Sequence, residues 1–122
     1  MICFENNREY VLRPAEYAPF EDSVAPLLEE EETVLLVCQA AGNGMIFTNR
    51  RVIAVDVQGM LGTQSDVCSL FYRSAQTFAC DRSEESCSLE VFLAGHKMVR
   101  FLFDYPDADL SPVTTALARF TL

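Results

Sequence analysis

The chain has 122 residues, of which 50% are hydrophobic and 22% are charged, and its formal net charge at pH 7 is −9. This composition is normal for a globular protein, so we expect no extensive disorder, and a domain of this length buries roughly two-thirds of the surface that its unfolded chain exposes. The negative charge opposes the counterion release that drives nucleic-acid binding and the attraction to anionic lipid headgroups, so we expect no nucleic-acid partner and disfavour membrane lipid.

The cysteines and the apolar runs indicate the compartment. The five cysteines are odd in number and form no Cys-x-x-Cys pair; they are Cys3, Cys38, Cys68, Cys80 and Cys87. We interpret them as reduced core thiols rather than a disulfide framework or a zinc site, and only Cys80 and Cys87 could face each other, across a hairpin. No apolar run approaches the ~20 residues of a membrane span, and the first residues lack a signal-peptide pattern. The sequence therefore favours a cytoplasmic protein.

The first 20 residues are mixed in character and contain Pro14 and Pro19. We expect an N-terminal arm over residues 1–20, loosely structured or forming an irregular strand, followed by one domain over residues 21–122. Prolines interrupt regular elements because proline donates no backbone hydrogen bond.

The segment "EDSVAPLLEEEE" (21–32) predicts a short helix. Asp22 or Ser23 can cap its start, and Pro26 lies in the first turn, where it does no harm. The four glutamates at positions 29–32 form a solvated end of this helix in our interpretation, because adjacent carboxylates repel each other and rarely converge on one ligand.

From residue 33 onward, apolar and polar residues alternate with a period of two, which is typical of strands. β-branched and aromatic residues fill these segments, and Gly, Asn, Asp or Ser mark the junctions, with tight turns at "GNG" (42–44) and "AGHK" (94–97). The predicted strands span residues 33–39, 44–49, 51–57, 63–72, 75–81, 87–94 and 97–103.

The C-terminal segment predicts an amphipathic helix from about Asp109 to Phe120, because Leu110, Val113 and Leu117 are spaced along one face with Phe120. The predicted fold class is therefore mainly β with a C-terminal α-helix. We expect a seven-stranded antiparallel barrel or sandwich, capped by that helix and preceded by the short N-terminal helix.

Three segments carry a family resemblance. They are "GMIFTNRRVIAVDVQGMLG" (44–62), "SLFYRSAQTF" (69–78) and "SLEVFLAG" (88–95). They resemble the bacterial PH-domain family, whose members show a Phe-Thr-Asn-basic-Arg hairpin and an Asp-x-Gln-Gly turn, here at residues 56–59. The resemblance implies a pleckstrin-homology (PH)-like fold, assembly as symmetric homo-oligomers and no established catalytic activity. Thr63 and Gln64 stand where members often have lysines, which argues against an inositol-phosphate pocket.

Arg50 and Arg51 are the candidate anion contacts. Strand alternation sends adjacent side chains to opposite faces, so they do not form one clamp. We favour a structural interpretation in which one arginine pairs with Asp56, Asp66 or a glutamate and the other lies at the rim.

We predict no catalytic residue, no metal site and no cofactor. His96 is the only histidine, and it falls in a predicted turn without a carboxylate to orient it. The aromatic residues of the strands exceed what a small barrel interior holds, so some of them are candidates for a self-association interface. These candidates are Phe71, Tyr72, Phe92 and Phe101.

The sequence thus favours a non-catalytic protein-interaction module that assembles with itself, as a ring or a dimer, and that can also bind another protein. The alternative is a PH domain that binds a phospholipid or inositol-phosphate headgroup.

Overall fold

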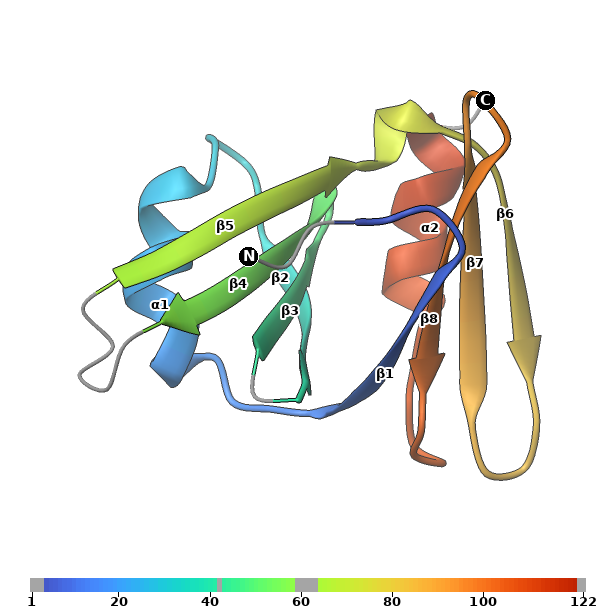
Figure 1. Ribbon diagram of the computed structural model, residues 1–122, viewed down its shortest axis with the longest axis horizontal. Coiled ribbons are helices and arrows are strands. Elements are labelled where there is room, and N and C mark those ends of the chain that lie inside the picture. The colour runs from blue at the N-terminus through green and yellow to red at the C-terminus, as the bar shows by residue number, and fades with distance from the viewer. Residues whose placement is uncertain (1–3, 42, 59–63, 121–122) are drawn as a thin grey trace.

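The computed structural model describes residues 4–41, 43–58 and 64–120, and shows a curled sheet of eight strands with a helix against it at the C-terminal end (Figure 1). The strand order across the sheet is β5-β4-β3-β2-β1-β8-β7-β6. The seven predicted strands are present as β2 to β8, with bounds Val34–Ala40, Asn43–Thr48, Arg51–Gln58, Gln64–Phe71, Ala75–Arg82, Cys87–Leu93 and Lys97–Phe103. The predicted fold class is confirmed.

The eighth strand, β1 (Arg8–Pro14), was not predicted as part of the sheet. It pairs in parallel with β8 along residues 8–12 and antiparallel with β2 at Arg13 and Pro14. It therefore joins the two halves of the sheet, and its Tyr10 and Leu12 are buried in the core. The sheet contains one parallel pair, so it is not the wholly antiparallel arrangement that we expected.

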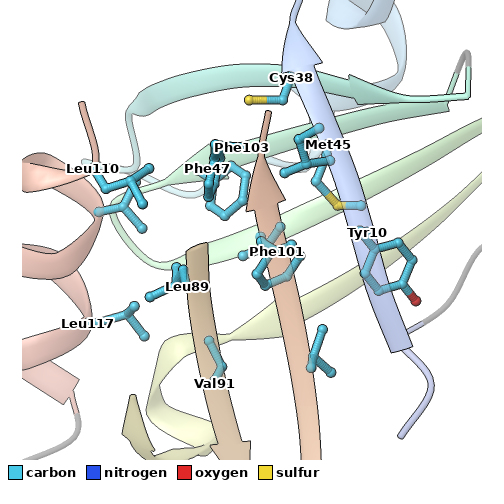
Figure 2. Close-up of a cluster of buried hydrophobic side chains, with 14 of the residues drawn as sticks. Tyr10, Cys38, Met45, Phe47, Leu89, Val91, Phe101, Phe103, Leu110 and Leu117 are labelled. Atoms are coloured by element: carbon cyan, nitrogen blue, oxygen red, sulfur yellow. The ribbon is translucent and has the colours of Figure 1, made fainter. Parts of the chain in front are cut away.

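Two hydrophobic clusters explain why β3 and β4 are apolar along most of their length. On one face of these strands, Met45 and Phe47 belong to the main core, whereas the neighbouring Ile46 belongs to a second cluster on the other face. A strand buried on both faces loses the alternation of a half-buried strand. The main core lies between the two halves of the sheet (Figure 2), where the ring of Phe47 lies 5.3 Å from that of Phe101 and 5.5 Å from that of Phe103.

The N-terminal helix covers the second cluster. Helix α1 spans Ala18–Val24 and continues into a 3₁₀ turn, η1 (Ala25–Leu27), so it begins earlier than predicted and Pro19, not Pro26, occupies its first turn. Its Phe20 ring packs directly on Gly44, and a Cβ atom at position 44 would lie 2.8 Å from that ring. Gly44 is thus required by the close approach of α1 to β3.

The C-terminal helix, α2 (Ser111–Phe120), closes the main core with Val113, Ala116 and Leu117. It begins two residues later than predicted, and the Oδ1 atom of Asp109 accepts a hydrogen bond of 3.1 Å from the backbone N–H of Ser111. In the hairpin between β7 and β8, Gly95 and His96 both adopt positive φ angles, of 77° and 62°, as a tight turn requires.

The cysteines only partly follow the expectation of reduced thiols. Cys38, Cys80 and Cys87 are free, whereas Cys68 is disulfide-bonded, so the expectation is wrong at that position.

Two of the predicted turns lie partly outside the described residues. Gly42 of the turn at 42–44 and Gly59 of the turn at 56–59 are not described, whereas Asp56 of the second turn belongs to β4. Among the described residues, no helix is long and apolar enough to cross a membrane.

Candidate functional site

The turn between β3 and β4 is organised by the side chain of Thr48. Its hydroxyl oxygen accepts hydrogen bonds of 3.0 Å from the backbone N–H groups of Arg50 and of Arg51, and the hydroxyl itself donates a 2.7 Å bond to the Oε2 atom of Glu32. A threonine at this position therefore fixes the turn and binds a carboxylate at the same time. Thr48 is completely buried.

Arg51 and Glu32 form a buried ion pair beside this turn. The Nε atom of Arg51 donates to Oε2 of Glu32 at 2.9 Å, and its Nη2 atom donates to Oε1 at 3.0 Å. Nη2 also donates to the backbone oxygen of Leu27, and Nη1 donates to Oγ of Ser69 at 3.3 Å. The guanidinium thus connects η1, the loop that leads into β2, and β5. It is engaged on all sides and does not form a vacant anion site.

The ion pair sets the protonation state of Glu32. Burial alone would raise the pKa of this carboxyl group, but hydrogen bonds from Arg51, from the backbone of Glu29 and from Thr48, together with the charge of Arg51, lower its pKa below the usual value. Glu32 is therefore ionised at neutral pH. The interpretation of residues 29–32 as a solvated helix end is therefore wrong at Glu32, which is buried beyond the end of η1, and no periodicity in the acidic run distinguishes it from its neighbours.

Tyr72 completes the network from the short 3₁₀ turn η2 (Tyr72–Ser74), which links β5 to β6. Its hydroxyl donates a 2.7 Å hydrogen bond to the backbone oxygen of Thr48. Burial, and to a lesser degree the negative charge of Glu32, raise the pKa of Tyr72 well above its usual value, so the hydroxyl remains a donor. The Phe-Thr-Asn-Arg-Arg segment and this tyrosine therefore act together to fix one corner of the sheet.

Arg50 lies at the rim of the same corner. Its Nη1 atom lies 3.0 Å from Oε2 of Glu29, and both side chains are partly exposed. The adjacent Asn49 accepts a 2.9 Å bond from the N–H of Thr33 and donates a 3.1 Å bond to the backbone oxygen of Glu31. The two arginines thus differ in burial, and the carboxylate partners of both come from residues 29–32.

A pocket of about 360 Å³ opens beside this corner, where η2 meets the end of α2. Three arginines line it, Arg50, Arg73 and Arg119, together with the rings of Phe71 and Phe120. The guanidinium of Arg73 lies over the ring of Phe71, with its carbon 5.1 Å from the ring centroid. Glu29, Glu31 and Asn49 complete the lining, so the pocket gathers positive charge in an acidic chain but is not free of carboxylates.

The four candidate interface aromatics divide into two groups. Tyr72 and Phe101 are buried in the core, with exposed fractions of 2% and 0%, so they cannot contact a partner in this structure. Phe71 and Phe92 are half-buried, and Phe92 lies on the outer face of β7 beside Met98 of β8. The core thus contains two of the four side chains, and the spacing of the aromatic residues in the sequence did not indicate which two.

Histidine and metal-ligating side chains are further candidates for chemistry in the described part of the chain. His96 is exposed in its turn, and no cluster of three or more His, Cys, Asp or Glu side chains lies within reach of one metal ion among the described residues.

The fold agrees with comparisons to known proteins. The profile of the bacterial PH domain family matches residues 6–121, and the chain belongs to this family. A DUF1696 family protein with a pleckstrin-homology domain from Shewanella loihica PV-4 superposes with a TM-score of 0.63 and 19% identity, over 93% of this chain and 99% of the other. A pleckstrin homology domain from Shewanella amazonensis SB2B gives a TM-score of 0.54 and 20% identity, over 88% and 90%. No curated protein matches the chain.

Proposed function

We propose that this PH-like domain is a non-catalytic assembly module, which pairs with further copies of itself through the edge of its sheet. A cytoplasmic location, expected from the sequence, is part of this proposal. Another protein that presents an extended strand could use the same edge.

The observation that carries the proposal is the open edge strand β6. In the described part of the chain, β6 pairs with β7 on one side and with no strand on the other (Figure 1). It is eight residues long, and its first six residues, 75–80, contain neither a charged residue nor a proline. Edge strands are commonly protected by such residues, because unpaired N–H and C=O groups otherwise accept a foreign strand.

The partner edge decides the symmetry. If β6 pairs with β6 of a second copy, the contact is self-complementary and stops at a dimer, whereas pairing of β6 with a different edge can close a ring. Phe92, half-buried on the neighbouring strand, can add apolar area to either contact. The net charge of −9 opposes association, so we expect the assembly to tighten modestly as salt is added.

Light scattering after size exclusion tests the proposal. The unmodified chain should have a mass above the 13.7 kDa of one copy, and Thr77→Glu with Ala79→Glu should return it to that mass. Both side chains are exposed on β6. Val11→Glu with Gln39→Glu adds the same charge at exposed positions on β1 and β2, which are separated from β6 by β7 and β8, and should leave the assembly intact. An unmodified chain that runs as a monomer at every concentration would refute the proposal.

The pocket with three arginines supports a second candidate function, the binding of a phospholipid or inositol-phosphate headgroup. We rank it second because two glutamates line the same pocket and Arg50 is already paired with Glu29. Titration with inositol hexakisphosphate and with phosphatidylserine vesicles at physiological salt should give no saturable binding. Saturable binding that disappears in Arg73→Glu would reverse the ranking.

A further inference from the structure

Two free thiols face each other in the hairpin of β6 and β7. The Sγ atoms of Cys80 and Cys87 lie 3.8 Å apart. In the strand register Cys80 lies opposite Leu89 and Cys87 lies opposite Arg82, so the two cysteines are diagonal neighbours on the same face of the sheet. This face is the inner one, because Leu89 and Cys87 belong to the main core.

The two thiols differ in access to solvent. Cys80 is exposed, whereas Cys87 is 2% exposed and lies behind it. Burial, and then the hydrogen bond and charge of Cys80, raise the pKa of Cys87 to about 11, so this thiol stays protonated near neutral pH. A reagent in solution therefore meets Cys80 first, and Cys87 is held within reach of any group formed on the Cys80 sulfur.

We propose that Cys80 and Cys87 form a reversible dithiol–disulfide pair, oxidised by hydrogen peroxide with Cys80 as the sulfur that is attacked first and Cys87 as the resolving thiol. The Cys80 sulfur attacks one peroxide oxygen and the O–O bond breaks, so that Cys80 becomes a sulfenic acid, and the departing hydroxide takes up the Cys80 thiol proton and leaves as water. The Cys87 sulfur then attacks the Cys80 sulfur, the S–O bond breaks, and the departing oxygen takes the Cys87 proton and leaves as water. The two thiols lose two electrons and two protons in all, and the peroxide becomes two water molecules.

The hairpin can accommodate the bond. The sulfur atoms must close from 3.8 Å to about 2.0 Å, the length of a disulfide bond. Diagonal neighbours need some backbone movement for this, and among the described residues the ladder of β6 has a partner strand on one side only, although Arg82 at its end also bonds to the backbone of Ala108. The turn itself is already closed, by a 2.9 Å bond from the N–H of Ser83 to the oxygen of Ser86.

The chemistry stands without the proposed function, but one consequence rests on it. The disulfide would fix β6 to β7 and so restrain the edge strand that we propose for assembly. Oxidation should then change the mass distribution in light scattering. If the chain is a monomer in both redox states while the disulfide forms, the assembly proposal fails and the thiol proposal remains.

Peptide mapping by mass spectrometry tests the pair directly in the full chain. Cleavage by trypsin after Arg73, Arg82 and Lys97 puts Cys80 in peptide 74–82 and Cys87 in peptide 83–97. After treatment of the reduced chain with hydrogen peroxide and alkylation of free thiols, we expect these two peptides to be joined, and dithiothreitol should separate them. A chain whose Cys80 is oxidised to sulfenic or sulfinic acid while Cys87 is still alkylated would overturn the proposal.

Three variants make the assignment specific. Cys80→Ser should leave Cys87 as an alkylated free thiol, and Cys87→Ser should let the sulfenic acid on Cys80 persist long enough to be trapped by dimedone. Cys38→Ala is the matched control, since Cys38 is buried beside the hydroxyl of Tyr105, 3.6 Å away, and should leave the joined peptides unchanged. Joined peptides in Cys80→Ser that still include peptide 83–97 would contradict the pairing.

Discussion

The corner around Arg51 and the hairpin of β6 and β7 each hold a close pair of charged or reactive groups, and they differ in how those groups are held. At the corner, Glu32 and Arg51 are buried, and hydrogen bonds join them to η1, β3 and β5. In the hairpin, Cys80 is exposed and lies on an edge strand with one partner strand.

The difference separates structural residues from residues available for interaction. Arg50, Arg51 and Thr48 make hydrogen bonds within the same chain, so their presence in the sequence does not by itself indicate a ligand. In the hairpin, the outer edge of β6 has no partner strand among the described residues and the Cys80 thiol is exposed, so both are open to other molecules. We therefore look for interaction at the edge and for stability at the corner.

Removal of the buried cation should give the largest effect. Arg51→Met leaves the carboxylate of Glu32 buried without its partner, and loss of one member of a buried ion pair costs about 3–5 kcal/mol of unfolding free energy. Urea unfolding measures this loss. Arg50→Met is the control, because its pair with Glu29 is partly exposed and such pairs contribute less than about 1 kcal/mol. Equal losses in the two variants would show that the corner is not the more tightly held region.

Acid should weaken the same pair by a smaller amount, because protonated Glu32 stays in place and still accepts hydrogen bonds. The pKa of Glu32 is lowered in the folded state from its ordinary value of 4.5. The stabilisation from Glu32 is therefore complete above that value and is lost as the pH falls through the lowered folded pKa. Urea unfolding at a series of acidic pH values should show this loss, and Glu32→Gln should lack that component of the pH dependence. An unchanged pH profile in the variant would contradict the assignment.

The smallest effect is expected in the hairpin. Under reducing conditions, Cys80→Ser should change the unfolding free energy by less than about 0.5 kcal/mol, as is usual for exposed positions. Cys38→Ser makes the same chemical change at a fully buried position and should cost more, since a buried hydroxyl needs a partner. Similar costs at the two sites would show that the hairpin is packed as tightly as the core.

The sequence by itself determined the seven strands β2 to β8 and the C-terminal helix, because alternation, turn residues and the apolar stripe of α2 are local signals. These features depend on residues close together in the chain. The sequence also predicted that one of the two arginines, Arg50 or Arg51, pairs with a carboxylate, but it did not identify Glu32, which lies 19 residues from Arg51.

Only the tertiary structure decided the rest. β1 joins the sheet through a parallel pairing with β8, some ninety residues away along the chain, and the two buried residues of β1 make too short a pattern to reveal that pairing. Glu32 was selected from four adjacent glutamates because only its carboxylate lies within reach of Arg51 and Thr48 once β3 and β4 are folded. Phe101 on β8 and Tyr72 in the turn η2 are buried while Phe71 and Phe92 are half-buried, because the packing of the whole sheet sets which side chains face the core. Side-chain burial and the pairing of strands that are distant in the chain depend on the whole sheet, so a local sequence pattern cannot predict them.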